Sequence, residues 1–232
     1  MSREVKRRHY DASGRRAQAR RTRRQVVATA HRLFVECGYV ATTMTDIAAA
    51  AGVSVELVYG AFKTKANLLK TVFDVTIAGD DEPVPLMERP ALLAVRAEPD
   101  PSRALHRYAA FVAEIAPRVY PVHLVVLTAA TSDAGVAALA DELATQRLTG
   151  MTMFARQLHL SGGLAVPEDE ARDLLWTLNA PQVYELFVLQ RGWSLARYER
   201  FLADTWTYTL IAHDHEAAVT DRPDVDGTDA AH

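Results

Sequence analysis

The 232-residue sequence has a single cysteine, Cys37, and no uninterrupted apolar stretch of the ~18 residues that a membrane span needs. One cysteine excludes a disulfide within the chain and a cysteine-based zinc site. The N-terminus, MSREVKRRHYDASGRRAQARR, is charged and has no apolar segment, so no secretory signal peptide is expected. These features favour a protein of the reducing cytoplasm.

Motifs for catalysis are also missing. The sequence has no Gly-rich phosphate loop, no nucleophile elbow and no His-Glu-x-x-His helix. The eight histidines are scattered, and the close pair His213 and His215 lies in an acidic tail, where a solvated charge cluster is the simpler interpretation. The sequence therefore predicts a protein that is not an enzyme and needs no metal or cofactor.

The small net charge of −3 hides a division between two parts of the chain. Residues 1–70 carry 14 Lys and Arg against five Asp and Glu, a charge of +9, which leaves −12 for residues 71–232. A basic first third on an acidic body suggests that the first third meets a polyanion. A solvated basic tail without a partner is the alternative.

Four regions follow from composition. Residues 1–20 form a basic arm expected to be disordered, and residues 213–232 an acidic tail of the same kind. Residues 21–66 form a DNA-binding domain and residues 67–212 a larger helical body. The first helix is expected from Arg24 to Cys37, with Cys37 as a small core residue and Gly38 as its C-terminal cap.

The expected fold class is all-α, because apolar residues recur with a period near 3.6 and no segment alternates like a strand. Residues 79–101 hold five of the ten prolines and are expected to be a loop with at most a helical turn around Leu92 to Arg96. Further helices are expected over 104–116, 119–131, 136–159, 168–179, 182–190 and 195–212.

The segment from Thr42 to Phe62 has the parts of a helix-turn-helix. Thr43 and Ser54 are placed as N-caps of two short helices, and Gly52 stands where the turn needs a left-handed backbone. Ile47, Ala51, Leu57 or Val58, and Phe62 are expected to point into the core. A hairpin of helices that merely packs is the less favoured interpretation.

The N-terminal side chains of a recognition helix read base edges, while its cap and the following turn contact phosphates. Lys63 and Lys65 flank the Thr64 cap of the next helix, so both are expected to reach phosphates. The candidate DNA-binding residues are Thr43, Ser54, Val55, Glu56, Tyr59, Gly60, Lys63 and Lys65.

From Arg24 to Val72 the sequence resembles the N-terminal domain of the TetR (tetracycline-repressor-like) transcriptional regulators. The segment LFVECGYVATTMTDIAAAAGVSVELVYGAFKTKANLL carries the resemblance, with departures at Leu57 and Ala61, where members commonly have Thr and His. The run WTLNAPQVYELFVLQRGWSLARYERFLADTW also resembles a segment of many members in which two helices pair with a second subunit. The resemblance implies a homodimer whose central helices enclose a small-molecule pocket.

One helix-turn-helix reads too few base pairs for specificity, so two-fold pairing is expected. An intramolecular core is the less favoured alternative for the candidate dimer-interface residues, which are Leu175, Leu186, Phe187, Phe201, Leu202, Trp206 and Leu210. Large or polar groups on apolar stretches are the candidate pocket residues, although plain core is the commoner role of such residues. They are Tyr108, Phe111, Tyr120, His123, Met151, Phe154, Trp176 and Asn179.

The sequence thus predicts a homodimeric, ligand-responsive, sequence-specific DNA-binding regulator, most simply a repressor released from a palindromic operator by a small molecule. One alternative is a constitutive architectural DNA-binding protein whose helical body only dimerises. A purely structural helical interaction protein is the other.

Overall fold

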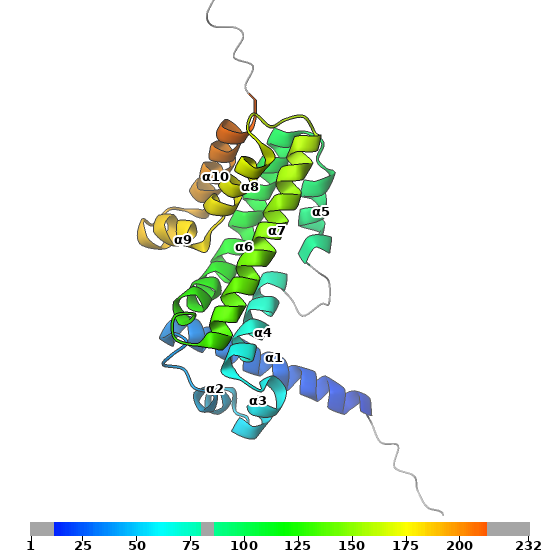
Figure 1. Cartoon of the computed structure of the whole chain (residues 1–232). Coiled ribbons are helices and arrows are strands. Elements are labelled where there is room, and N and C mark those ends of the chain that lie inside the picture. Colours follow the sequence, from blue (N-terminus) through cyan, green and yellow to red (C-terminus); the bar gives the residue numbers. More distant parts are fainter. Residues whose placement is uncertain (1–11, 80–85, 213–232) are drawn as a thin grey trace, which may run out of the picture.

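The expected all-α fold is confirmed by the computed structural model, which describes residues 12–79 and 86–212 (Figure 1). Helices α1 to α4 form a head at one end, and α5 to α10 form a larger body. Their bounds are α1 Ala12–Cys37, α2 Met44–Ala51, α3 Val55–Phe62, α4 Lys65–Ala78, η1 Leu86–Glu88, α5 Pro90–Ala97, α6 Pro101–Ala129, α7 Ala134–Leu160, α8 Glu168–Leu178, α9 Pro181–Tyr184, η2 Glu185–Gln190 and α10 Leu195–Leu210.

The first helix begins at Ala12, well before the expected Arg24, so residues 12–20 are helical and not part of a disordered arm. Arg, Ala and Gln dominate this stretch and are all good helix formers. They extend a helix whose later turns are fixed in the core by Val26, Ala30 and Phe34. Residues 1–11 of the expected arm, and the expected acidic tail 213–232, lie outside the described residues.

Cys37 is exposed at the last turn of α1, so its expected place in the core is wrong. The α1 residues that pack inward are Val26, Val27, Ala30 and Phe34. Continuing that spacing by three or four residues past Phe34 reaches Cys37, but the helix ends there and Gly38 turns the chain at φ 80°. Tyr39, at 5% exposure, fills the core position instead and packs against Phe34.

The body is built around α6, which runs unbroken through Pro117 and Pro121, where two separate helices were expected. Each proline removes one backbone donor, but Pro117 is exposed and Pro121 only half-buried, and buried residues continue on both sides of them. α6 is also apolar and long enough to cross a membrane by length and composition, contrary to expectation. Half of that apolar window is buried among the other helices, so its hydrophobicity is explained as a core helix.

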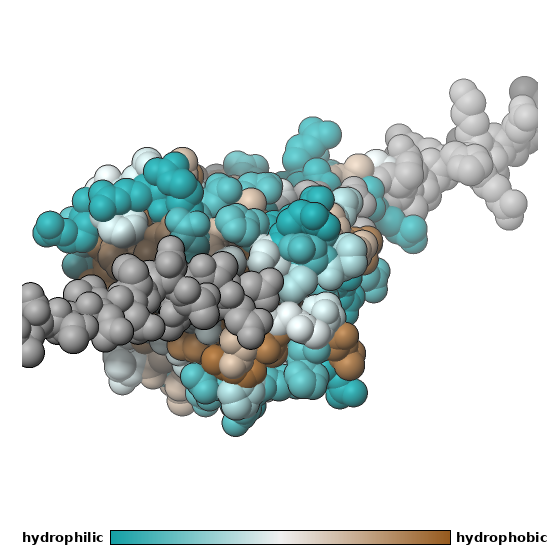
Figure 2. Space-filling model, turned by 90° about the horizontal axis from the view of Figure 1, so that it is seen from above, coloured by the Kyte–Doolittle hydropathy of each residue, from teal (hydrophilic) through white to brown (hydrophobic). Residues whose placement is uncertain are grey.

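Helices α8, α9 and α10 cover α6 and α7 on one side of the body (Figure 1). Helix α8 ends at Leu178, and α9 begins at Pro181 and runs into the π-helical turn η2. The position of Pro181 predicts this interruption of the helix. At the far end, Leu164 and Ile211 form an isolated antiparallel bridge. Seen from that end, most of the visible surface is hydrophilic, with hydrophobic side chains gathered in a few places (Figure 2).

Four expected dimer-interface residues are instead part of this chain's own core. Leu175, Leu202, Trp206 and Leu210 are each 0% exposed within one chain. Helix α10 packs along α6 with its apolar face inward, and α8, which carries Leu175, packs against α7 and α10. Phe187 and Phe201 are half-buried. Phe187 stacks on Trp193, and Phe201 meets Trp193 edge-on and Phe187 at a tilt. Leu186, 53% exposed, is the expected interface residue that one chain leaves uncovered.

Candidate nucleic-acid interface and ligand cavity

The turn between α2 and α3 has the expected local chemistry. Thr43 and Asp46 form a reciprocal capping box at the start of α2, in which each side chain accepts a hydrogen bond from the other's backbone N–H. Gly52 adopts φ 66°, the left-handed conformation that ends α2, and Ser54 Oγ accepts from the Leu57 N–H to cap α3. These caps fix how α3 leaves the turn.

Helix α3 buries one face and leaves the other open. Val58 and Phe62 are buried, which settles the inward residue as Val58, whereas Leu57 and Tyr59 are 43% and 50% exposed. Glu56 and Gly60 are exposed beside them, while Val55 is half-buried. The expected base-reading residues Glu56, Tyr59 and Gly60 therefore lie on one open surface, with the caps Thr43 and Ser54 also exposed.

Lys63 is exposed at the end of α3 on a strained backbone. Its φ of 66° is the one positive value among the described residues other than glycine. With ψ at −54° and the Thr64 N–H donating to the Phe62 carbonyl at 2.8 Å, it forms a rare γ-turn. Strain of this kind persists where the surrounding fold imposes it, and it marks functional positions.

Lys65 is half-buried and forms hydrogen bonds within the head. Its ammonium donates to the carbonyls of Tyr39 at 2.8 Å and Thr42 at 3.0 Å, and lies 4.1 Å from the centre of the Tyr39 ring. The Tyr39 hydroxyl in turn donates to Asp133, 2.7 Å away, which also caps α7. Lys65 thus ties the loop after α1 to α4, and a phosphate contact from the same ammonium stays a prediction.

The helical extension of α1 adds positive charge to the head. Arg16, Arg20, Arg21 and Arg24 are exposed along it. Arg23 lies 4.4 Å over the Phe62 ring at the end of α3, which brings the basic face of α1 next to the exposed α3 surface.

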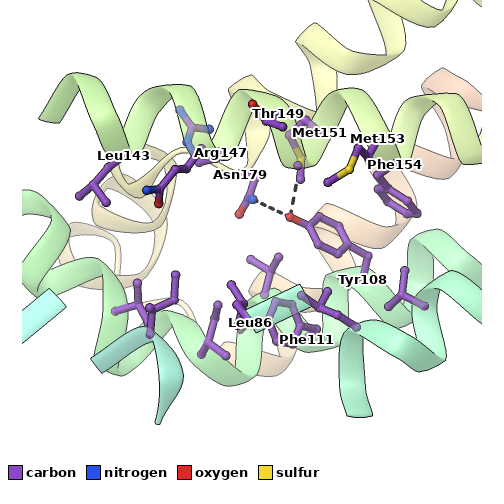
Figure 3. Close-up of a pocket in the computed structure, with 18 of the residues that line it drawn as sticks. Leu86, Tyr108, Phe111, Leu143, Arg147, Thr149, Met151, Met153, Phe154 and Asn179 are labelled. Carbon is purple, nitrogen blue, oxygen red and sulfur yellow. Dashed lines mark hydrogen bonds between the residues drawn. The ribbon is translucent and has the colours of Figure 1, made fainter. Parts of the chain in front are cut away.

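A second candidate site is a cavity of about 820 Å³ in the body, within the roughly 300–1,000 Å³ range of small-molecule sites. It lies among α4, α5, α6 and α7, with the end of α8 at one side (Figure 3). Seven expected pocket residues line it, namely Tyr108, Phe111, Tyr120, His123, Met151, Phe154 and Asn179.

Trp176 is the expected pocket residue that does not line the cavity. Its ring lies under the Arg147 guanidinium, 4.2 Å from the guanidinium carbon, at the contact between α7 and α8. Arg147 itself does line the cavity and was missed, as were Phe73 and Ile77 of α4. The signal in the sequence was the spacing of Leu143, Arg147 and Met151, which places an arginine on the apolar stripe of a helix.

The polar groups of the cavity converge on Asn179, at the C-terminal cap of α8. Its side-chain amide nitrogen donates to the Tyr108 hydroxyl at 2.8 Å, and its side-chain oxygen accepts from the Tyr120 hydroxyl. The Tyr108 hydroxyl faces the Met151 sulfur at 3.6 Å. Burial raises the pKa of both tyrosines, so both stay protonated donors.

His123 lies on the same wall, edge-on to Phe73 of α4 with ring centres 5.3 Å apart. Burial, together with the positive charge of Arg147, lowers its pKa to about 4. At neutral pH His123 is therefore an uncharged polar group in an apolar wall.

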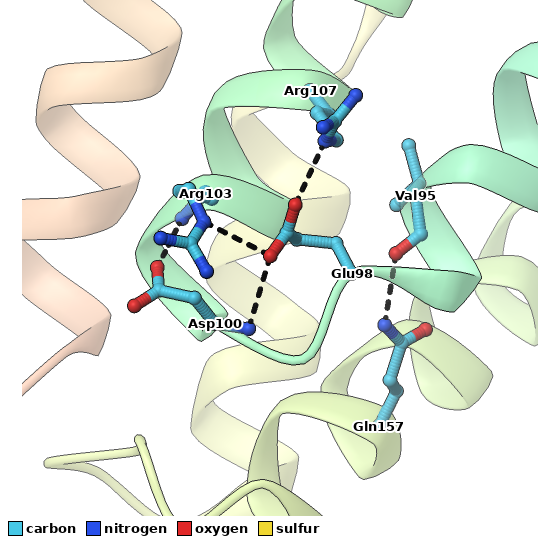
Figure 4. Close-up of polar contacts among 6 residues, drawn as sticks. All are labelled: Val95, Glu98, Asp100, Arg103, Arg107 and Gln157. Carbon is cyan, nitrogen blue, oxygen red and sulfur yellow. Dashed lines mark hydrogen bonds and ion pairs between the residues drawn. The ribbon is translucent and has the colours of Figure 1, made fainter.

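Helix α5 closes one side of the cavity and is held at its end by polar contacts (Figure 4). Gln157 of α7 donates to the Val95 carbonyl at 3.1 Å. Glu98 pairs with Arg103 and Arg107 of α6, each at 3.0 Å, and the hydrogen bond from Arg103 is the main cause of its lowered pKa. The cavity wall is thus fastened to the two helices behind it.

Helix α4 belongs to both sites. Its first half holds Lys65 and the buried Leu68 and Leu69 in the head, while Phe73 and Ile77 in its second half line the cavity. Lys70 also pairs with Glu142 of α7 at 2.6 Å. One continuous helix therefore connects the cavity with the head.

Comparison with known proteins agrees with this arrangement. Residues 26–72 match the family described as bacterial regulatory proteins, tetR family. That segment runs from the buried half of α1 to the middle of α4 and contains the whole helix-turn-helix. No curated protein matches the sequence.

Solved structures show the same fold at low sequence identity. A transcriptional regulator from Saccharomonospora viridis, solved with choline, is 19% identical, with a TM-score of 0.65 over 84% of this chain and 100% of that one. NalD of Pseudomonas aeruginosa, the secondary repressor of the MexAB-OprM multidrug efflux pump, is 18% identical, with a TM-score of 0.63 over 84% and 98%. A tetR-family regulator from Mesorhizobium loti is 17% identical, with a TM-score of 0.62 over 84% and 99%.

Proposed function

Because this chain is a transcriptional regulator of the tetR family, which is a family of regulators and not of enzymes, we propose that it is a repressor controlled by a small molecule. Two copies bind a palindromic operator through their α3 helices, and a ligand in the α4–α7 cavity releases them. The observation that carries the proposal is that α4 is shared between the DNA-binding head and the cavity.

Base reading is assigned to the open face of α3. Glu56, Tyr59 and Gly60 face outward there, and in a helix-turn-helix this face enters the major groove. Phosphate contact is assigned to Lys63, to the caps Thr43 and Ser54, and to the arginines of the α1 extension. Positive charge next to an exposed helix carrying Leu57 and Tyr59 is explained better by a nucleic-acid partner than by solvent.

Ligand control follows from the geometry of the shared helix. An occupant of the cavity contacts Phe73 and Ile77 and so biases the position of α4. Fourteen residues of helix extend roughly 21 Å, so a small tilt at the cavity moves the head by more. Two heads must match two half-sites at once, and a changed spacing weakens both contacts together.

Dimerisation is assigned to the outer faces of α8, η2 and α10. Leu186 and Leu189 are each 53% exposed there, next to the half-buried Phe187 and Phe201. Exposed apolar side chains gathered in this way are typical of protein interfaces. A DNA-binding regulator of this kind acts in the cytoplasm, where its operator lies.

The experiment is a pull-down of genomic DNA fragments by the purified protein, followed by a screen for small molecules that release the enriched fragment. One palindromic motif that a compound releases supports a ligand-controlled repressor. Enrichment that falls steeply with salt but shows no motif would replace it with an architectural DNA-binding protein.

A further inference from the structure

The charges around the cavity are of one sign. Among the described residues that line it, Arg96, Arg147 and Arg156 are the ionised side chains, and none is Asp or Glu. Among the described residues, none of these three arginines forms an ion pair, whereas Arg32, Arg103, Arg107 and Arg172 do. The positive charge at the cavity is therefore unbalanced by its own walls.

Arg147 is the most buried of these cations and has an unmet hydrogen-bonding need. One guanidinium nitrogen donates to the Trp176 carbonyl near the end of α8, and the plane of the group covers the Trp176 ring. Its Nε–H is buried and has no acceptor. A buried donor without a partner costs free energy, and the missing anion beside this half-buried cation adds to that cost.

A hydroxyl donor lies close to the same end of the cavity. Figure 3 shows Asn179 between Arg147 and Tyr108, with the Tyr108 hydroxyl directed at Asn179 and at the Met151 sulfur. A thioether sulfur is a weak acceptor, so the Tyr108 proton is free to turn to a better one. Asn179 holds the Tyr108 ring oxygen in place while it does so.

The remaining lining gives the opposite chemistry. Leu92, Val95, Phe111, Ile115, Val119 and Phe154 form long apolar walls. Their area favours a hydrocarbon or aromatic body that is removed from water on binding. The cavity thus has one cationic, polar end and otherwise apolar walls. It fits a ligand with an anionic group at one end and an apolar body.

We propose that the ligand of this cavity is an amphipathic anion, with an apolar body against α5 and α6 and one carboxylate held by Arg147 and the Tyr108 hydroxyl. The assignment rests on the proposed function, which makes the cavity the effector site. It differs from the choline held by the Saccharomonospora viridis regulator, because a quaternary ammonium ion would be repelled by Arg147 and would meet no carboxylate among the described lining residues.

The test compares three probes with the same ten-carbon chain, namely decanoate, decanol and decyltrimethylammonium. Each is titrated into the full-length protein without DNA, below its micelle concentration, with binding measured by calorimetry. Decanoate is expected to bind at least about tenfold more tightly than decanol, since a charge-assisted hydrogen bond is about twice as strong as a neutral one. Decyltrimethylammonium is expected to bind most weakly. Equal binding of decanoate and decanol, or tighter binding of the cation, overturns the proposal.

Variants locate the anion. R147Q is expected to lower the affinity for decanoate to that of decanol and to leave decanol binding unchanged, while R147K keeps the preference for the anion. R172Q removes an arginine of α8 that pairs with Asp173 away from the cavity, and it should bind all three probes like the wild type. A uniform loss of all three probes in both R147Q and R147K would make Arg147 a packing residue and overturn its assignment.

Failure here and failure of the proposed function are separable. Anion-selective binding that does not release operator DNA leaves the ligand class standing and refutes ligand control. Release of the operator by a neutral or cationic compound that occupies the cavity supports ligand control and refutes the anion.

Discussion

Substituting glutamine for His123 should flatten the dependence of stability on pH between 7.5 and 5. The folded chain holds the pKa of His123 at about 4, chiefly because the ring is buried, while an unfolded histidine titrates near 6.5. A base whose folded pKa is lowered binds fewer protons when folded than when unfolded. Its contribution is therefore constant above 6.5 and is lost as pH falls toward 4.

The size of the effect follows from the two pKa values. At pH 5 nearly all unfolded chains carry the His123 proton, and few folded chains do. The linkage relation then gives a loss of about 2 kcal/mol in the free energy of unfolding relative to pH 7.5. Carboxylates with lowered pKa values, such as Glu98 and Asp133, titrate mainly below this window.

The assay is urea unfolding followed by circular dichroism at pH 7.5 and 5.0, at one protomer concentration, for wild type, H123Q and H106Q. His106 is exposed on the same helix, which makes H106Q the matched control. Wild type and H106Q should each lose about 2 kcal/mol more than H123Q on acidification. The same loss in all three proteins would refute the burial of His123 and, with it, the apolar cavity wall.

Three further substitutions separate the roles of neighbouring groups. K63G relieves the strain of the γ-turn at φ 66° and should raise the free energy of unfolding by about 1 kcal/mol. It should also lower the salt slope of DNA binding by about one, because one phosphate contact is lost. A loss of stability would mean that the turn is not strained. K65M removes two hydrogen bonds to the loop after α1 and should lower the free energy of unfolding by about 2 kcal/mol. The salt slope of DNA binding should stay unchanged, and a lower slope would show that Lys65 contacts a phosphate. L186E changes an exposed residue and should give folded monomers by sedimentation, whereas W206E changes a fully buried residue and should prevent folding. An L186E variant that stays dimeric would place the dimer interface elsewhere.

The head could be predicted closely because its signals are local. Thr43, Gly52 and Ser54 act within three or four residues of themselves, through caps and a left-handed turn, so their spacing carries the geometry. The all-α class followed for the same reason, from periodicity along each helix. The ends of helices were harder to predict. Helix α6 continues through Pro117 and Pro121 because other helices pack against it.

Residues whose roles depend on distant neighbours were placed less well. Nothing in the segment around Lys65 shows that the carbonyls of Tyr39 and Thr42 lie within reach of its ammonium. Trp206 and Leu210 are apolar in a way that suits a partner chain or the same chain equally, and α6 proved to cover them.

The cavity shows a similar limit. Aromatic and polar residues at helical spacing identified the inward faces of α6 and α7, and seven of them do surround the space. The space itself depends on how four helices meet, which no single segment encodes. Arg147 was missed because an arginine is usually solvated, and its burial beside Trp176 needs α8 in place.

Selection of binding sites from random double-stranded DNA tests the central claim most directly, with wild type and E56A run side by side. Wild type should enrich a two-fold symmetric motif whose half-sites lie one helical turn or a multiple apart. E56A should keep the symmetry and change the preferred base at one position in each half-site. Selection that enriches no motif, or an E56A motif identical to that of the wild type, would contradict recognition by the open face of α3.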